Sequence, residues 1–165
     1  MLVVGFDPGS AITGYGVVEG RGSRLCHVAH GAIRTQAGLP AHERLAVIYA
    51  EARALLEKHR PDAAAIERLY FKQNVSTGIS VAQARGVLLL AAAHAHCPIG
   101  EFSPTEMKTA VTGYGRADKR QLQEMIKMLL NLDAPPRPDD AADALALAIC
   151  QIQTGAVQQR IRDAR

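Results

Sequence analysis

The chain has 165 residues, of which 48% are hydrophobic and 21% charged, a length and composition that suit one globular domain with a full hydrophobic core. Its longest apolar run, residues 87–93, is far shorter than the roughly 20 residues that cross a bilayer, and residues 1–6 lack the features of a signal peptide. We therefore expect a cytoplasmic protein without membrane contact. The net charge of +3 permits a nucleic-acid partner without requiring one.

The N-terminal part of the sequence predicts three strands joined by short turns. Residues 2–6 form an apolar run that ends at Asp7, which is typical of a buried strand. Residues 14–18 and 26–33 are similar, and glycines between them supply turns. Consecutive strands with short connections predict an antiparallel meander.

The rest of the sequence alternates predicted helices and strands. Apolar residues recur at helical spacing in 40–59, 74–96, 105–111, 119–130 and 139–153, and short apolar runs at 63–66 and 98–102 predict two more strands. The order βββαβαβααα predicts an α/β fold, with a mixed five-stranded sheet flanked by helices. The second half of the 74–96 helix is apolar nearly all round, so we expect the core on one side and a second subunit on the other. We take residues 1–153 as a single domain and residues 154–165 as a basic C-terminal tail.

Four carboxylates fall where this fold could bring them together. Asp7 ends the first strand, Glu67 ends the fourth, and Asp140 and Asp143 open the last helix three residues apart, on one helical face. Parallel neighbouring strands end at the same edge of a sheet, where sites are commonly built. Hard oxygen ligands suit Mg²⁺ or Mn²⁺, and two such ions can activate a water and stabilise the leaving oxygen of a phosphodiester.

Each of these acids has a plainer interpretation when it is taken alone. An Asp after a strand is usually a turn residue, and an Asp at a helix start is usually an N-cap. Glu67 fits such a role less well, because an unpaired charge at the end of a buried strand costs free energy. The conjunction of the four favours a metal site.

Five short motifs resemble those of the RuvC family of crossover (Holliday) junction endodeoxyribonucleases, in the family's order. They are Asp7-Pro-Gly-Ser10, Thr13-Gly-Tyr-Gly16, Ala65-Ile-Glu67, Ala82-Gln-Ala-Arg-Gly86 and Asp140-Ala-Ala-Asp-Ala-Leu-Ala146. The resemblance covers residues 1–153. It implies an RNase H-like fold, a homodimer, and Mg²⁺-dependent symmetric nicking of four-way DNA junctions during recombination and repair, with a branch-migration helicase complex as a further partner. It assigns the metal ligands to Asp7, Glu67, Asp140 and Asp143, with two ions per active site and Mn²⁺ as an alternative to Mg²⁺.

One position departs from the family's pattern. The family motif has one Asp before Ala-Ala-Asp, whereas this chain has two, Asp139 and Asp140. Spacings of four and three to Asp143 both lie on one helical face, so either Asp is geometrically possible. Alignment with the motif assigns the metal to Asp140. Asp139 then lies in the first helical turn after Pro138, where the helix dipole stabilises a carboxylate.

Basic residues around loop 112–116 are candidates for holding DNA. Lys108 and Lys119 flank this loop and resemble lysines that the family has near its active site, so we expect them to hold the scissile phosphate and take part in catalysis. Arg116 and Arg120 are expected to contact DNA phosphates. Any one of these charges could instead be a solvated surface group.

The segment after Glu67 contains Tyr70, Phe71 and Lys72, which we take as DNA-binding candidates. The resemblance places at Tyr70 an aromatic that stacks on an unpaired junction base, a contact worth about 1–3 kcal/mol. Adjacent side chains of an extended segment point to opposite sides, so one of the two aromatics could simply pack inward.

The sequence also contains features that suggest other functions. His94, His96 and Cys97 suggest zinc, but residues two apart on a helix do not face each other. The glycine-containing hairpin after Asp7 could bind nucleotide phosphates, as in sugar kinases and actin-like ATPases, but that fold needs a second similar domain. Two alternatives stay open: an RNase H-like nuclease that acts on RNA, and a junction-binding module without catalysis.

Overall fold

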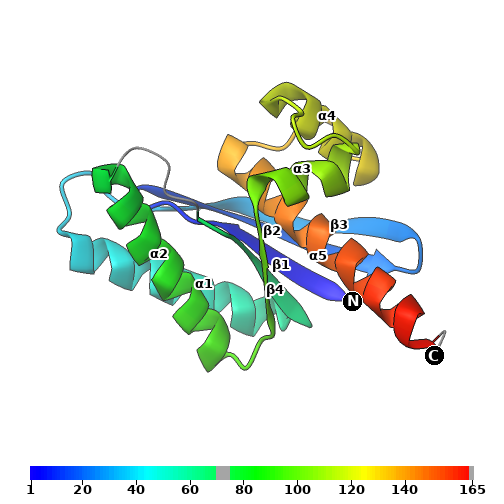
Figure 1. The fold of residues 1–165 in the computed structure, drawn as a ribbon. Helices are drawn as coiled ribbons and strands as arrows, with labels where there is room; N and C mark the ends of the chain where they lie inside the picture. The colour runs from blue at the N-terminus through cyan, green and yellow to red at the C-terminus, as the bar shows by residue number, and fades with distance from the viewer. Residues whose placement is uncertain (70–74, 164–165) are drawn as a thin grey trace.

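The computed structural model describes residues 1–69 and 75–163 of the chain (Figure 1). Its elements follow the predicted order. They are β1 Leu2–Asp7, β2 Ile12–Arg21, β3 Arg24–Arg34, α1 Ala41–His59, β4 Ala63–Glu67, α2 Val75–His94, β5 Ile99–Phe102, α3 Pro104–Thr112, α4 Lys119–Leu129 and α5 Asp139–Asp163. Within these described ranges no helix is long and apolar enough to span a bilayer.

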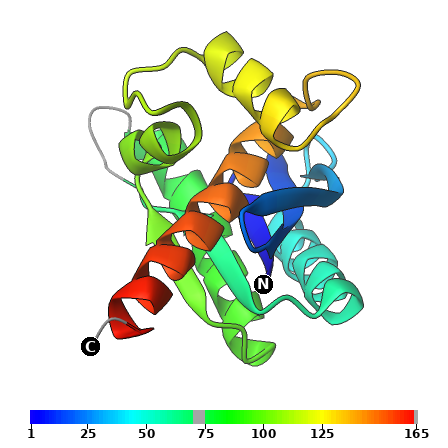
Figure 2. The ribbon, with the colours of Figure 1, turned by 90° about the vertical axis from the view of Figure 1, so that its right-hand side faces the viewer.

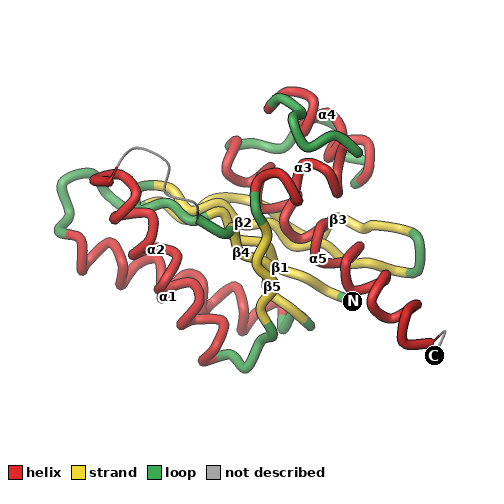
Figure 3. The backbone as a smooth tube through the Cα atoms, in the orientation of Figure 1, coloured by secondary structure: helices red, strands yellow, loops and turns green. Residues whose placement is uncertain are grey.

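The strands form one mixed sheet in the order β3-β2-β1-β4-β5, drawn in yellow in Figure 3. The first three strands form the predicted antiparallel meander, and β4 then pairs with β1 in parallel. Phe6 lies opposite Ile66 in this parallel pair. The next residues along each strand, Asp7 and Glu67, therefore end at the same edge of the sheet.

Helices cover both faces of the sheet and define two cores (Figures 1 and 2). Side chains alternate between the faces along each strand. On β1, Val3 belongs to the core beneath α5, whereas Val4 belongs to the core beneath α1 and α2. The same alternation on β4 puts Ala65 on the α5 side and Ile66 on the other. Asp7 and Glu67 keep the parity of the α5 side, so both lie on the face that carries the last helix.

The backbone of α5 lies directly on the sheet because glycines line its path. A Cβ added to Gly5 would lie 1.9 Å from the Ala144 carbonyl oxygen, and one added to Gly14 would lie 2.0 Å from the Asp140 carbonyl oxygen. Gly16 is in similar contact with Leu145. No other residue fits at Gly14 without moving the helix, so these glycines set the position of the first turns of α5.

Several elements are longer than the sequence predicts, the last helix most of all. The last helix was predicted to end at Gln153, but α5 continues to Asp163, because glutamine and arginine are good helix formers and no proline interrupts them. The helix predicted over residues 74–96 is α2, Val75–His94, and the core covers one side of it, while a second subunit on the other side stays a prediction. Leu88 is buried, whereas Ile79 and Leu90 are 53% and 49% exposed.

Candidate active site

Four carboxylates from three distant segments gather at the edge where β1 and β4 end. The carboxyl groups of Asp7 and Glu67 lie within hydrogen-bonding reach of each other, a contact that requires a proton on one of the two. The charges of Glu67, Asp143 and Asp140 all act on Asp7, so the first turns of α5 bring their acids to the strand ends. The structure thus brings together all four predicted metal-binding residues.

Burial and mutual repulsion disfavour the charged forms of these acids. Burial, together with the negative charges of Glu67, Asp143 and Asp140, raises the pKa of Asp7 to about 8. Burial also raises the pKa of Asp143 to about 6 and, with the charge of Asp143, raises the pKa of Glu67. Such a cluster cannot be fully ionised at neutral pH unless cations compensate it.

The donor set fits Mg²⁺ or Mn²⁺, since it consists of carboxylate oxygens only. In the positions that the structure gives to residues 1–69 and 75–163, no three His, Cys, Asp or Glu side chains are arranged to hold one metal ion together. The carboxylates are therefore neighbours that a bound ion would have to draw closer. Burial first, and the nearby negative charges second, raise the pKa values of Asp7 and Glu67.

The turn after β1 is held by Thr13, whose role the sequence analysis did not identify. This fully buried residue donates its hydroxyl to the Gly9 carbonyl at 2.7 Å and accepts a 3.4 Å hydrogen bond from the Gly9 amide. A Cβ on Gly9 would lie 2.1 Å from the Ile12 carbonyl oxygen. The motif residues around Asp7 thus fix the turn that orients this carboxylate. Gly14 lets α5 approach it.

The Asp139 carboxylate is bound by side chains outside the carboxylate cluster. It accepts hydrogen bonds from Gln123 Nε2 at 2.8 Å and from Arg137 at 3.0 Å, and Lys119 Nζ lies 3.1 Å from its other oxygen. The hydrogen bonds from Lys119 and Gln123 hold the pKa of Asp139 below its usual value. Among the charges that act on Asp7 are those of Asp140 and Asp143 but not that of Asp139. This supports the predicted register, with Asp140 rather than Asp139 as the ligand.

Two lysines lie beside the cluster, as predicted. The positive charges of Lys119 and Lys108 both lower the pKa of Asp143, against the larger effect of burial. Each lysine belongs to a helix that starts with a capping box, Ser103 and Glu106 in α3 and Asp118 and Gln121 in α4. These caps fix the helix starts and hence where the lysines project.

The remaining DNA-binding candidates fall into two groups. Arg116 and Arg120 are exposed, and none of the ion pairs found between described residues involves either, so both are available to contact phosphates. Tyr70, Phe71 and Lys72 lie outside the described residues, and their stacking and DNA-binding roles stay predictions.

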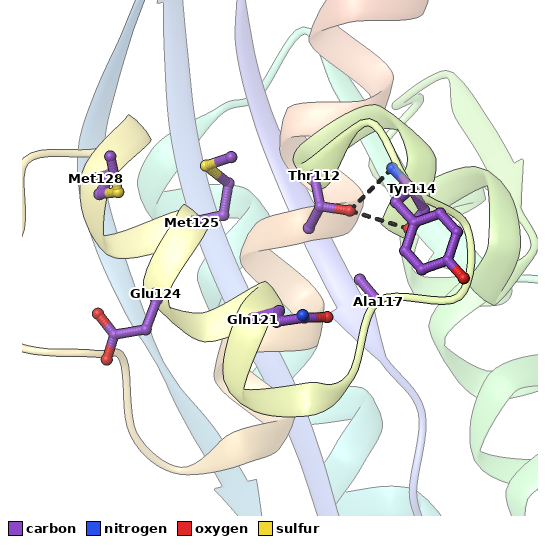
Figure 4. Close-up of a pocket in the computed structure, with 7 residues that line it drawn as sticks. All are labelled: Thr112, Tyr114, Ala117, Gln121, Glu124, Met125 and Met128. Carbon is purple, nitrogen blue, oxygen red and sulfur yellow. Dashed lines mark hydrogen bonds between the residues drawn. The ribbon is translucent and has the colours of Figure 1, made fainter.

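The loop between α3 and α4 is braced by Thr112 (Figure 4). Its hydroxyl donates to the Tyr114 carbonyl at 3.0 Å and accepts a 3.1 Å hydrogen bond from the Tyr114 amide. A cavity of about 380 Å³ opens beside this loop. It is lined by Thr112, Tyr114, Ala117, Gln121, Glu124, Met125 and Met128. None of the four carboxylates lines it, so the cavity is a feature separate from the candidate active site.

The residues that suggested a zinc site or a nucleotide-phosphate site make structural contacts instead. His94 Nδ1 lies 2.6 Å from the Tyr49 hydroxyl and so joins α2 to α1. Gly14 and Gly16, which suggested a phosphate-binding hairpin, provide the close contact with α5 described above.

A mixed α/β sheet with carboxylates at the shared edge of its parallel strands, flanked by lysines, is the arrangement of an RNase H-like nuclease. Comparison with known proteins narrows this class. A family model described as "Crossover junction endodeoxyribonuclease RuvC" matches residues 3–151. The chain belongs to this RuvC family and is thus a crossover junction endodeoxyribonuclease, an enzyme that resolves Holliday junctions.

Individual relatives agree with this assignment. The RuvC proteins of Thermosipho melanesiensis and Chloroflexus aggregans are each 53% identical to the chain, over 91% and 97% of its length and 96% and 98% of theirs. The structure of Thermus thermophilus RuvC in complex with Holliday junction substrate matches with a TM-score of 0.91 and 33% identity, over 96% of both chains. The resemblance seen in the sequence motifs is confirmed, and so is the RNase H-like fold.

Proposed function

We propose that this enzyme nicks four-way DNA junctions symmetrically, at a divalent-metal site formed by Asp7, Glu67, Asp140 and Asp143. The observation that carries the proposal is geometric: Asp7 and Glu67 end parallel neighbouring strands at one edge of the sheet, and Gly14, opposite Asp7, is in backbone contact with Asp140 at the start of α5. The substrate class is supported by the Thermus thermophilus relative, whose structure holds a Holliday junction substrate.

The chain's own residues would bind, orient and stabilise the reacting groups. Mg²⁺ or Mn²⁺, with two ions in each site, would supply the activation of water and the stabilisation of the leaving oxygen. Lys108 and Lys119 would hold the scissile phosphate over the carboxylates and offset its charge. Lys119 is paired with Asp139 in the free protein, so a DNA phosphate competes with Asp139 for this ammonium group.

A homodimer would supply two matched sites for two matched cuts. The exposed side chains of Ile79 and Leu90 lie eleven positions apart on α2, about three helical turns, and so share one face. We propose that this apolar face is the dimer interface. Light scattering that shows only monomer at micromolar concentration, with and without junction DNA, would contradict it. The branch-migration helicase partner also stays a proposal, to which no surface is assigned.

One experiment separates the proposed function from its two alternatives. The enzyme is incubated with Mg²⁺ and, in parallel, with a four-way junction, matched duplex and structured RNA. We expect paired nicks in the junction alone, and none after chelation of the metal. Cleavage of the RNA instead would favour the alternative nuclease, and tight junction binding without any cleavage would favour the binding module.

The Asp7→Asn variant tests the metal site within the same assay. Asp7 is expected to bind metal and to repel the phosphate, so its neutralisation should abolish nicking and leave junction binding intact or tighter. Substantial residual nicking would count against Asp7 as a ligand.

A further inference from the structure

Arg85 connects α2 to the end of the strand that carries Glu67. It belongs to the motif Ala82-Gln-Ala-Arg-Gly86, which the proposed chemistry does not use. Its Nε donates a 2.9 Å hydrogen bond to the backbone carbonyl of Glu67, and its terminal nitrogen pairs with the Glu101 carboxylate on β5. The Arg85 side chain is only 19% exposed, so the guanidinium is largely shielded from water.

The Glu67 carbonyl lies just beyond the last residue of β4 that pairs with β1. Pairing of β4 with β1 ends at Ile66, one residue before Glu67. On the other side, the Arg68 amide donates to the Phe102 carbonyl at 2.7 Å, so the edge facing β5 remains hydrogen-bonded. The carbonyl of Glu67 takes its partner from a side chain instead of a strand, and that partner is Arg85.

We propose that Arg85 is a positioning residue that aims the Glu67 carboxylate at the metal site by clamping the Glu67 main chain. This rests on the proposed function, in which Glu67 is a ligand. Only a guanidinium can do this from α2, because it donates to the carbonyl and to Glu101 at once through a rigid planar fork. A lysine has one ammonium on a flexible stem, so it can pair with Glu101 while losing the geometry at Glu67.

The clamp also joins two parts of the molecule. Helix α2 carries the exposed residues Ile79 and Leu90, while Arg85 reaches from the same helix to the strand end beneath the active site. Arg85 therefore links the helix with the exposed apolar face directly to the main chain of Glu67.

The test compares Arg85→Lys with Arg53→Lys. Arg53 pairs with Glu57 on the exposed surface of α1, so it is a matched control that keeps the same chemical change away from the site. Mg²⁺ affinity is measured by calorimetry without DNA, and junction affinity is measured in Ca²⁺. We expect Arg85→Lys to weaken Mg²⁺ binding about tenfold or more, as for other residues that orient metal ligands. Junction affinity should change less than about twofold, and Arg53→Lys should alter neither quantity.

A kinetic measurement adds a signature that general damage would not give. Cleavage by Arg85→Lys should be slow at low Mg²⁺ and return towards the wild-type kcat at saturating Mg²⁺, with KM for the junction unchanged. Unchanged Mg²⁺ affinity in folded Arg85→Lys would overturn the proposal. An equal loss of junction affinity would also overturn it, by making Arg85 a DNA contact.

The Glu67→Gln background separates this proposal from the proposed function. If Arg85 acts through Glu67, adding Arg85→Lys to Glu67→Gln should weaken Mg²⁺ binding no further. If Glu67→Gln alone leaves Mg²⁺ affinity intact, the assigned ligand set is wrong whatever Arg85 does. Should Arg85→Lys fail to fold, Glu101→Gln provides a second test, because it removes the charge that holds the Arg85 guanidinium. Glu101→Gln should also weaken Mg²⁺ binding, and an unchanged Mg²⁺ affinity would contradict the proposed role of Arg85.

Discussion

The two faces of the sheet are packed in different ways, one by contact between backbones and the other by contact between side chains. On one face α5 touches the sheet backbone to backbone at Gly5 and Gly14. On the other face, side chains such as Ile48 of α1 and Leu88 of α2 form an ordinary apolar layer between helices and sheet. The α5 face therefore fixes distances between main chains, which is what a cluster of acids from separate segments requires. The α2 face leaves apolar side chains uncovered.

The largest expected effect is at the start of α5. Asp140→Asn should reduce Mg²⁺-dependent nicking more than about a hundredfold, since loss of a ligand should exceed the 10–100-fold effect of changing its outer partners. Asp139→Asn is the neighbouring control. It should cost little activity and slight stability, because Asp139 pairs with Lys119 and Gln123 outside the cluster. Cleavage rates of both variants in identical Mg²⁺ decide between them, and an inactive Asp139→Asn with an active Asp140→Asn would show that the register is wrong.

Gly14→Ala tests the close contact itself. The new Cβ would meet the Asp140 carbonyl, so α5 must move. We expect a loss of about 1–3 kcal/mol in the free energy of unfolding and about a hundredfold in cleavage rate, as for an ångström-scale misplacement.

The control for Gly14→Ala lies in the same helix that Gly14 touches. Gly155→Ala places its Cβ at ordinary contact distance from Met1 and should raise stability by about 0.5–1 kcal/mol, because alanine is the better helix former. Denaturant titration measures both variants. Equal, small effects at the two glycines would show that the close approach of α5 is unimportant.

Leu90→Glu tests the uncovered face of α2. A charge in the centre of an apolar interface should convert dimer to monomer at micromolar concentration, and the paired nicks should become independent single nicks. Met128→Glu is the matched control, because Met128 is 73% exposed on α4, away from α2. Light scattering gives the mass of each variant. If Leu90→Glu is still a dimer, α2 does not form the interface.

The parts of the fold and site that could be predicted from the sequence depend on local patterns, whereas the other parts depend on contacts between residues that are distant in the sequence. Charges directly after buried strands marked Asp7 and Glu67, and the spacing of three marked Asp140 and Asp143. The rule that parallel neighbouring strands end at the same edge of a sheet then predicted that these acids lie close together. The partners of Asp139 could not be foreseen, because tertiary packing brings Gln123 to it from 16 residues away. Arg85 and Glu67, 18 residues apart, likewise meet only through the docking of α2 on the sheet.

The smallest expected effect is on stability, and its sign follows from the pKa values. Asp7 and Asp143 have raised pKa values in the folded protein, about 8 and about 6, so the folded state binds more protons than the unfolded state above about pH 4. Without metal, these acids make the free energy of unfolding fall as pH rises from about 4 to 8. Asp7→Asn should remove much of this slope and raise Tm at pH 8 by about 2–4 °C. Measuring Tm of both proteins in chelator across this pH range checks this. If Tm falls with pH equally in both proteins, the raised pKa of Asp7 is contradicted.

The position of the metal ions tests the central claim most directly. Crystals of the enzyme with an uncleavable four-way junction and Mn²⁺ can be measured at the manganese absorption edge. The account predicts two anomalous peaks about 3.5–4 Å apart, ligated by Asp7, Glu67, Asp140 and Asp143, with Asp139 still bonded to Gln123. Peaks coordinated by Asp139, or no peak among the four carboxylates, would contradict it.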